Sequence, residues 1–228
     1  MKNFKKLIYI TDDGSSTIFL PDFNEYYHSK HGAVSESEHV FIKNGLKFWL
    51  KNNPNKEYCN IFEVGFGTGL NALLTYKESK LIPNTKLTYS SVEAHPLKFS
   101  EIKKLNYEIN LNDNDQTFNF IHHSEWNSPV QLSKNFILIK NNSTIQNFNI
   151  KISADIIYFD PFCYRVQPEM WSNKVLNPIV NSMNKYSIFV TFSSMSILFD
   201  LLQDLELSVE KIPGPNQKKK MIRAIKIH

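Results

Sequence analysis

Three glycines at alternate positions, Gly65, Gly67 and Gly69, follow directly on a short, mostly apolar run at 59–64. Such a run is typical of a buried parallel strand. Residues 70–80 then repeat apolar side chains at helical spacing. Because glycine has no Cβ atom, the backbone between strand and helix can turn tightly and lie against a ligand. The segment therefore predicts a strand, a glycine turn and a helix whose first N–H groups are free.

The spacing of the glycines narrows the class of ligand. A dinucleotide-binding turn needs Gly-x-Gly-x-x-Gly, and the third position after Gly67 is Leu70. Together with Glu63, the glycines resemble Glu-x-Gly-x-Gly-x-Gly, the first motif of class I S-adenosylmethionine methyltransferases. This resemblance implies that Glu63 orients the loop and that Gly65, Gly67 and Gly69 pass under the methionine part of the cofactor. The alternative is a turn that only packs a strand against a helix, because short motifs also match by chance.

Composition restricts the class of protein. A chain of 228 residues, 42% of them hydrophobic, accommodates one α/β domain with a small extension. The net charge of +4 permits a polyanionic partner but does not indicate one. The two cysteines, Cys59 and Cys163, make neither a disulfide framework nor a zinc site, so we expect a reducing compartment and no metal. No apolar run is long enough for a membrane span or a signal peptide, so a cytoplasmic protein is expected.

Residues 1–55 are expected to form an extension that precedes a methyltransferase domain at 56–228. Two short apolar runs, 7–10 and 17–20, flank a turn of Asp and Gly residues and predict a β-hairpin. A Ser-x-x-Glu capping box at Ser35 then predicts the start of a helix that ends at an Asn-Asn-Pro sequence.

The remainder of the chain alternates strands and helices, which indicates an α/β fold with a mostly parallel, doubly wound, Rossmann-like sheet. Ligands of such sheets bind beyond the carboxyl ends of the strands, where Glu93, Asp160 and the glycine turn are expected to meet. The expected elements are strands at 59–64, 87–92, 118–122, 156–159 and 187–192, helices at 70–80, 96–105, 177–184 and 197–205, an inserted hairpin at 136–140 and 145–150, and a closing antiparallel pair at 207–212 and 221–227.

Two acids at strand ends are candidates for chemistry. Glu93 can accept both ribose hydroxyls of a nucleoside cofactor, although surface acids at strand ends are also common. Asp160-Pro161-Phe162 resembles the Asp/Asn-Pro-Pro-aromatic signature of amino-group methyltransferases. A carboxylate that accepts an N–H hydrogen bond directs the lone pair of an amine at the methyl group, and it can remove a proton from an ammonium ion. Phe162 can pack on a planar base; the alternative is that Asp160 caps the next helix and Phe162 belongs to the core.

Five strings of the sequence, in the right order and over nearly the whole chain, carry a more specific resemblance. The strings are Thr11-Asp12-Asp13-Gly14-Ser15; Tyr27-His28-Ser29-Lys30-His31-Gly32-Ala33 with Glu36-Ser37-Glu38-His39-Val40-Phe41-Ile42; Phe66-Gly67-Thr68-Gly69-Leu70-Asn71; Asp160-Pro161-Phe162 with Pro168-Glu169-Met170-Trp171-Ser172; and Pro213-Gly214-Pro215 with Lys218-Lys219-Lys220-Met221. Together they look like the tRNA 5-methylaminomethyl-2-thiouridine methyltransferase family, which is called MnmD alone and MnmC when fused to an oxidase.

This family methylates the aminomethyl group on the wobble uridine of certain tRNAs with S-adenosylmethionine. The resemblance implies that tRNA is the partner, that Asp160 meets the amine, and that the cofactor site is lined by Tyr27, Glu36, Gly65, Gly67 and Glu93. The chain departs from the family where Pro161 follows the acid and where 163–167 replaces a loop that ends in a lysine. No fused oxidase domain is expected in this chain.

The densest basic cluster is Lys218, Lys219, Lys220 and Arg223, which can contact tRNA phosphates or can form a solvated turn. Three further side chains, His122, His123 and Trp126, lie at or just after the end of the expected third strand, where methyltransferases often contact adenine. Adjacent histidines on a strand point to opposite faces, which argues against a metal site.

Two other functions remain open on the sequence. Another amino-group methyltransferase, acting on adenine or on a protein, would also use an Asp-Pro-Phe sequence. A non-catalytic RNA-binding module could keep the fold without the activity. We predict a methyltransferase that acts on tRNA, because the N-terminal strings argue against the first alternative and the intact glycines and Asp160 argue against the second.

Overall fold

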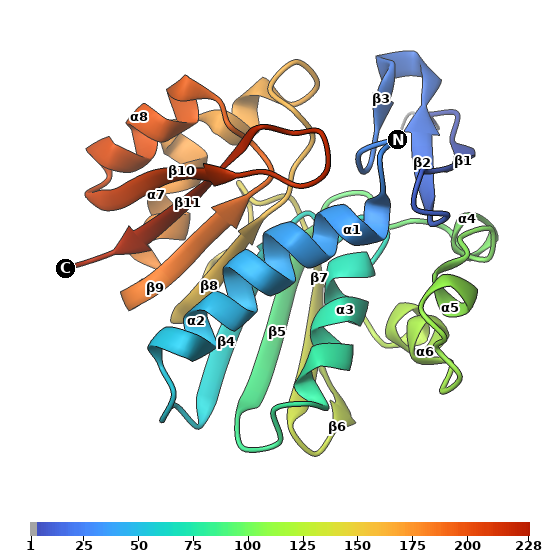
Figure 1. The fold of residues 1–228 in the computed structure, drawn as a ribbon, viewed down its shortest axis with the longest axis horizontal. Helices are drawn as coiled ribbons and strands as arrows, with labels where there is room; N and C mark the ends of the chain where they lie inside the picture. Colours follow the sequence, from blue (N-terminus) through green and yellow to red (C-terminus); the bar gives the residue numbers. More distant parts are fainter. Residues whose placement is uncertain (1–3) are drawn as a thin grey trace.

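An eight-stranded sheet in the order β10-β11-β9-β8-β4-β5-β7-β6 forms the centre of the molecule (Figure 1). The computed structural model describes residues 4–228. Strands β7, β5, β4, β8 and β9 run parallel, and β11 and β6 run antiparallel to their neighbours. The strands are β4 (Tyr58–Val64), β5 (Lys86–Glu93), β6 (Pro129–Ser133), β7 (Phe136–Asn142), β8 (Ala154–Phe159), β9 (Met183–Thr191), β10 (Leu207–Pro213) and β11 (Lys220–Lys226).

The strand order reverses between β4 and β8, because the chain adds β5 and β7 on one side of β4 and then returns to place β8 on the other. Such a switch point is the usual ligand site of an open α/β sheet. Helices α3 (Leu70–Ser79), α7 (Asn173–Asn181) and α8 (Ser196–Asp204) cover the sheet. The mostly parallel, doubly wound sheet and the antiparallel closing pair predicted from the sequence are confirmed.

Each face of the sheet carries its own apolar core, because successive side chains of a strand point to opposite faces. Ile61 of β4 packs in a cluster with Phe41 of the N-terminal helix, whereas its neighbour Phe62 packs on the other face with residues of α7 and α8. These strands are buried on both faces, which explains their nearly continuous apolar sequences.

The N-terminal residues form a small three-stranded sheet, β1 (Leu7–Ile10), β2 (Ser16–Leu20) and β3 (Glu25–Tyr26), with a 3-10 turn η1 (Pro21–Phe23) before β3. A long helix follows as α1 (Ala33–Ser37), the π-helical η2 (Glu38–Lys47) and α2 (Phe48–Asn52), and it crosses one face of the large sheet (Figure 1). The hairpin and helix predicted ahead of the core sheet are therefore confirmed.

The capping box predicted at Ser35 is wrong. The helix begins at Ala33, and Ser35 lies inside its first turn. The N–H groups of Ala33 and Val34 donate to Oγ of Ser15, at 3.1 and 3.2 Å, and the N–H of Ser35 donates to Oδ2 of Asp13 at 2.9 Å. Side chains of the β1–β2 turn thus cap the helix from a distance in the sequence, which a local pattern cannot show.

The third expected strand is also wrong, because residues 117–123 form helix α6 (Thr117–His123). The strand beside β5 is β7, so 136–140 belongs to the main sheet and not to an inserted hairpin, and 145–150 contains no strand. Short apolar runs do not distinguish a strand from a buried helical turn. The helix expected at 96–105 is shorter than predicted. Only α4 (Phe99–Ile102) forms there, and α5 (Tyr107–Asn110) follows it.

No helix within residues 4–228 is long and apolar enough to cross a bilayer.

Candidate active site

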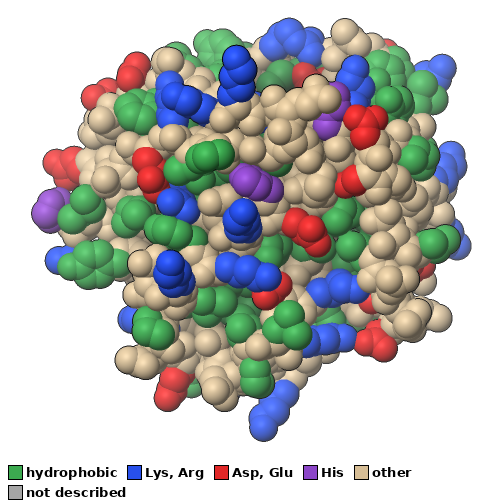
Figure 2. Space-filling model, viewed as in Figure 1, with side chains coloured by type: hydrophobic (Ala, Val, Ile, Leu, Met, Phe, Trp, Pro, Cys, Tyr) green, Lys and Arg blue, Asp and Glu red, His purple; other side chains and the backbone are tan. Residues whose placement is uncertain are grey.

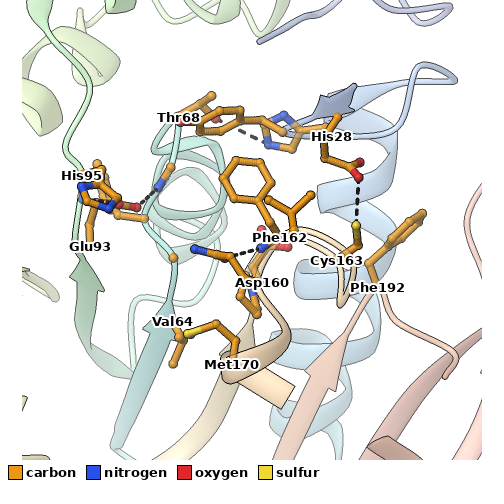
Figure 3. A pocket seen from close by; sticks show the side chains of 18 of the residues that line it. His28, Val64, Thr68, Glu93, His95, Asp160, Phe162, Cys163, Met170 and Phe192 are labelled. Atoms are coloured by element: carbon orange, nitrogen blue, oxygen red, sulfur yellow. Dashed lines mark hydrogen bonds between the residues drawn. The ribbon is translucent and has the colours of Figure 1, made fainter. Parts of the chain in front are cut away.

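A cavity of about 1260 Å³ opens at the carboxyl ends of β4, β5 and β8, beneath the small N-terminal sheet (Figure 3). Its size exceeds the range of about 300–1,000 Å³ that is usual for one small ligand, so it has room for a cofactor and part of a second molecule. The acids Glu93 and Asp160 and the glycines Gly65 and Gly67 all line it, as do Tyr27 and Glu36 of the N-terminal region.

The glycine turn needs its glycines because of backbone conformation and close approach. Gly65, Gly67 and Gly69 have φ values of 95°, 52° and 73°, which side chains of other residues rarely allow. A Cβ atom at Gly65 would lie 2.6 Å from the carbonyl oxygen of Asp160, so the two strand ends touch here. A Cβ atom at Gly67 would lie 3.4 Å from the Tyr27 ring, in the space between the turn and that ring.

Glu93 ties the end of β5 to the glycine turn. Its Oε2 atom accepts the N–H of Gly67 at 3.0 Å, and its Oε1 atom accepts the N–H of His95 at 2.7 Å (Figure 3). A carboxylate has about four acceptor positions. Two of them therefore remain for donors in the cavity, which suits the ribose hydroxyls expected from the sequence.

Asp160 leaves the end of β8 beside the glycine turn. Its Oδ2 atom accepts a hydrogen bond of 2.9 Å from Nδ2 of Asn71, and the same nitrogen donates to Oε1 of Glu63 at 3.1 Å. Burial raises the pKa of Asp160 to about 7, against the opposing effect of the Asn71 hydrogen bond. A carboxyl group with such a pKa can accept a proton at neutral pH.

Glu63 lies behind the turn and is fully buried. It does not line the cavity, and it reaches the turn through Asn71. Burial raises the pKa of Glu63 to about 8, so it is mostly neutral at pH 7. Sequence reasoning had included Asn71 in a family string without a role. Its position in the first turn of α3, two residues after the last glycine, is the signal in the sequence that points to such a role.

An aromatic pair closes one wall of the cavity. The rings of Tyr27 and Phe162 meet edge to face with centroids 4.9 Å apart. The N–H of Phe162 donates to Oε1 of Gln167 at 3.0 Å, and Nε1 of Trp171 donates to the Phe162 carbonyl at 3.1 Å. These bonds fix the position of Phe162 in the cavity wall. Trp171 belongs to the short helix η3 (Pro168–Trp171).

The loop that departs from the family sequence is attached to the N-terminal sheet. Sγ of Cys163 donates to Oε2 of Glu25 at 2.8 Å (Figure 3). The guanidinium of Arg165 donates to the same carboxylate at 2.9 Å and to the carbonyls of Phe23 and Asn24 at 2.7 and 3.2 Å. The altered residues therefore fix the loop to the strand that leads to Tyr27.

A buried histidine joins the N-terminal sheet to the glycine turn. Nδ1 of His28 lies 3.0 Å from Oγ1 of Thr17, and Nε2 lies 3.5 Å from Oγ1 of Thr68 (Figure 3). Burial lowers the pKa of His28 to about 4, so the ring is neutral at pH 7.

The expected basic cluster has three different surroundings. Arg223 donates to Oε1 of Glu210 at 2.7 Å and its guanidinium lies 3.5 Å from the centre of the Phe48 ring. Lys218 lines the cavity, whereas Lys219 and Lys220 are exposed. On the face shown in Figure 2, basic side chains are spread among acidic and apolar ones and form no single block.

The histidines and the tryptophan expected near adenine do not line the cavity. His122 is buried in α6 with Nε2 3.0 Å from the Thr68 carbonyl oxygen, and burial lowers its pKa to about 3. His123 stacks on Phe99 instead, with ring centroids 4.3 Å apart. Trp126 is also absent from the wall. The residues at and beyond the ends of β5 and β7 that do line it were missed by sequence reasoning, and they include His95, Asn142, Ser143 and Ile145.

No group of His, Cys, Asp and Glu side chains within residues 4–228 is arranged to hold a metal ion.

Comparison with known proteins identifies relatives of the chain. Residues 116–227 match the family model described as S-adenosyl-L-methionine-dependent methyltransferase. The curated tRNA 5-methylaminomethyl-2-thiouridine biosynthesis bifunctional protein MnmC of Leptospira interrogans is 29% identical over 209 residues, which are 88% of this chain and 32% of that protein. The MnmC of Leptospira borgpetersenii is 30% identical over 213 residues, with the same coverage. The chain is therefore related to the methyltransferases of this family model and to part of these MnmC proteins. It spans about a third of their length.

Solved structures agree on the fold of this MnmC relative. The crystal structure of MNMC2 from Aquifex aeolicus superposes with a TM-score of 0.77 at 22% identity, over 98% of this chain and 71% of that chain. A putative class I S-adenosylmethionine-dependent methyltransferase from Listeria monocytogenes gives a TM-score of 0.52 at 12% identity, over 87% and 64%. The class I methyltransferase fold predicted from the sequence is confirmed, and S-adenosylmethionine is the cofactor of the family.

The cavity of this MnmC relative fits that cofactor. Gly67 leaves a space below Tyr27 that a Cβ atom would enter, and Glu93 keeps acceptor positions for a ribose.

Proposed function

We propose that the protein transfers a methyl group from S-adenosylmethionine to the aminomethyl group of the modified wobble uridine in tRNA, giving 5-methylaminomethyl-2-thiouridine. One observation carries the proposal: the carboxyl group of Asp160 lies in the same cavity as the glycine turn, with Phe162 beside it. The names of the MnmC relatives support the choice of substrate.

S-adenosylmethionine supplies an electrophilic methyl group when it is bound. The substrate amine is mostly an ammonium ion near neutral pH, and it has no lone pair in that form. Asp160 attracts the cation, accepts one of its protons, and holds the resulting N–H as a hydrogen-bond donor, so that the lone pair points at the methyl carbon. The pKa of about 7 suits this exchange, because the group must be charged before the transfer and able to take the proton.

The aromatic wall gives the second half of the proposal. Phe162 offers a flat face to the uracil ring, and the edge-to-face contact with Tyr27 holds Phe162 in place. Residues 1–55, which we propose as an extension of the methyltransferase domain at 56–228, supply both Tyr27 and Glu36 to the cavity. An enzyme that acts on tRNA works in the cytoplasm, which we propose as its location.

The test has two stages. S-adenosylhomocysteine should raise the melting temperature of the protein, and NAD should not. Single-turnover reactions should then methylate tRNA from a strain that lacks this enzyme, with 5-methylaminomethyl-2-thiouridine found by nucleoside analysis. Methylation of adenine or of protein, with none on the aminomethyl uridine, would overturn the proposal, and so would cofactor binding without any transfer.

A further inference from the structure

Lys218 turns away from solvent and into the cavity. It belongs to the turn between β10 and β11, and its Nζ atom lies 3.9 Å from the centre of the Phe192 ring in the cavity wall. The turn is fixed over α1, because Nδ2 of Asn216 donates to the His31 carbonyl at 3.1 Å and to Oγ of Ser35 at 3.0 Å (Figure 1). The direction of the Lys218 side chain is therefore set by the fold.

Glu36 faces Lys218 from the first turn of α1. It is 3% exposed, and its Oε2 atom accepts the N–H of Ser29 at 3.0 Å. Its other oxygen has no hydrogen-bond partner among residues 4–228. Burial, with smaller effects of the nearby Asp160 and Asp13, raises the pKa of Glu36 to about 8, whereas the hydrogen bond from Ser29 and the charge of Lys218 act to lower it.

Lys218 and Glu36 are not paired with each other. Within residues 4–228, the Nζ atom of Lys218 lies more than 4 Å from every carboxylate oxygen. Burial lowers the pKa of Lys218, because a charged ammonium group without an anionic partner is destabilised in this half-buried position. A basic and an acidic group that line one cavity without touching leave room between them for a ligand that carries both charges.

We propose that Lys218 and Glu36 form the receptor for the zwitterionic amino-acid end of S-adenosylmethionine, with Lys218 binding the α-carboxylate and Glu36 the α-ammonium group. The ammonium charge, once bound, stabilises the charged form of Glu36. This assignment rests on the cofactor of the proposed function and not on its substrate. It moves Lys218 from the tRNA surface, where the sequence placed it, to the cofactor site.

The test compares two ligands that differ in the amino-acid end. S-adenosylhomocysteine carries it, and 5′-methylthioadenosine lacks it but keeps the adenosine and the thioether. Lys218→Met keeps an unbranched side chain on the Phe192 ring and removes the charge. By calorimetry, this variant should bind S-adenosylhomocysteine about 10- to 100-fold more weakly than the wild type, as for a lost hydrogen bond between charged groups. Its affinity for 5′-methylthioadenosine should stay the same.

A matched control comes from the same hairpin. Lys211 lies over the Phe199 ring at 5.1 Å, but it is exposed and outside the cavity. Lys211→Met should change neither affinity. A third ligand, the decarboxylated form of S-adenosylhomocysteine, separates the two roles. This ligand has no carboxylate for Lys218, so Lys218→Met should bind it as the wild type does. It keeps the ammonium group, so Glu36→Gln should bind it more weakly.

Equal affinities of wild type and Lys218→Met for S-adenosylhomocysteine would overturn the proposal, and melting temperatures verify that both are folded. Lys218→Met could also bind S-adenosylhomocysteine as the wild type does and yet transfer methyl groups to tRNA more slowly. That result would place Lys218 at the substrate, and it too would overturn the proposal. None of the binding experiments uses tRNA. A failure of the proposed tRNA reaction would therefore be visible separately from a failure of this assignment.

Discussion

The Nδ2 atom of Asn71 lies 2.9 Å from Oδ2 of Asp160 and joins the first turn of α3 to the end of β8. The amide has a second hydrogen, which it donates to Glu63. One neutral amide thus donates to both carboxyl groups, and within residues 4–228 neither carboxyl group forms an ion pair with a Lys, Arg or His side chain. Glu63 is fully buried and does not line the cavity, so Asp160 is the one of these two carboxyl groups that a bound molecule can reach.

Removing the Asn71 amide should move the pH dependence of methyl transfer. The hydrogen bond from Asn71 stabilises the charged form of Asp160 and so lowers its pKa. In Asn71→Leu, the pH at half-maximal single-turnover rate should therefore rise above the wild-type value, which we expect near 7. Affinity for S-adenosylhomocysteine serves as the control for folding. An unshifted profile in a folded variant would show that Asn71 only packs the loop.

Asp160→Asn and Asp160→Ala should both slow the transfer of methyl groups to tRNA by about a hundredfold or more, as for the loss of a general base. Asn keeps the shape and one acceptor, so the Ala variant should be at least as slow. Both should still bind S-adenosylhomocysteine. The measurement is single-turnover transfer to tRNA that carries the unmethylated aminomethyl uridine. A wild-type rate in Asp160→Ala would assign the residue to helix capping.

The sequence predicted the elements whose signal is local and missed the contacts that depend on folding. The glycine turn was predictable because strand, glycines and helix follow one another within a few residues. The bond from Asn71 to Asp160 joins positions 89 apart, so no local pattern shows it. The same holds for Ser15, which caps a helix from the preceding hairpin. The direction of the Lys218 side chain depends on where the β10–β11 turn meets α1.

Gly67→Val should abolish cofactor binding. The new side chain would start 3.4 Å from the Tyr27 ring and fill the space proposed for the methionine part of the cofactor. Gly14→Val is a matched control, because Gly14 also has a positive φ, of 80°, but lies outside the cavity. Both variants should lose stability through backbone strain. In calorimetry, only Gly14→Val should retain the wild-type affinity for S-adenosylhomocysteine; the proposed cofactor site would be wrong if Gly67→Val retained it too.

The ligand-free protein should lose stability as the pH rises from 6.5 to 8. Burial raises the pKa values of Glu36 and Glu63 from 4.5 to about 8 and that of Asp160 from 3.8 to about 7. Between the unfolded and the folded pKa value of each group, the folded state binds more protons than the unfolded state. The free energy of unfolding therefore falls as the pH rises through that interval. His28 and His122 have lowered pKa values and act in the opposite sense, but only below about 6.5.

The melting temperature should therefore fall on the order of 10 °C between pH 6.5 and 8, from about 1.4 kcal/mol per pKa unit and the usual scaling for a domain of this size. Glu63→Gln carries no titrating proton at that position and should show a shallower decline. A melting temperature that is constant or that rises over this interval would contradict the raised pKa values.

Lys219 and Lys220 should contribute to tRNA affinity through phosphate groups. Both are exposed beside the cavity, so they can reach the backbone of a tRNA whose anticodon loop enters it. Replacing both by Ala should weaken binding and flatten its dependence on salt, by roughly 0.7–0.9 in the log–log slope for each lost phosphate contact. Arg223→Ala is the contrasting variant. The Arg223 guanidinium already donates to Glu210 and lies on the Phe48 ring. Loss of this side chain should therefore lower the melting temperature and leave the salt slope unchanged. Filter binding between low and moderate salt measures the slopes. An unaltered slope in the double variant would mean that the turn is only solvated and that tRNA approaches over another face.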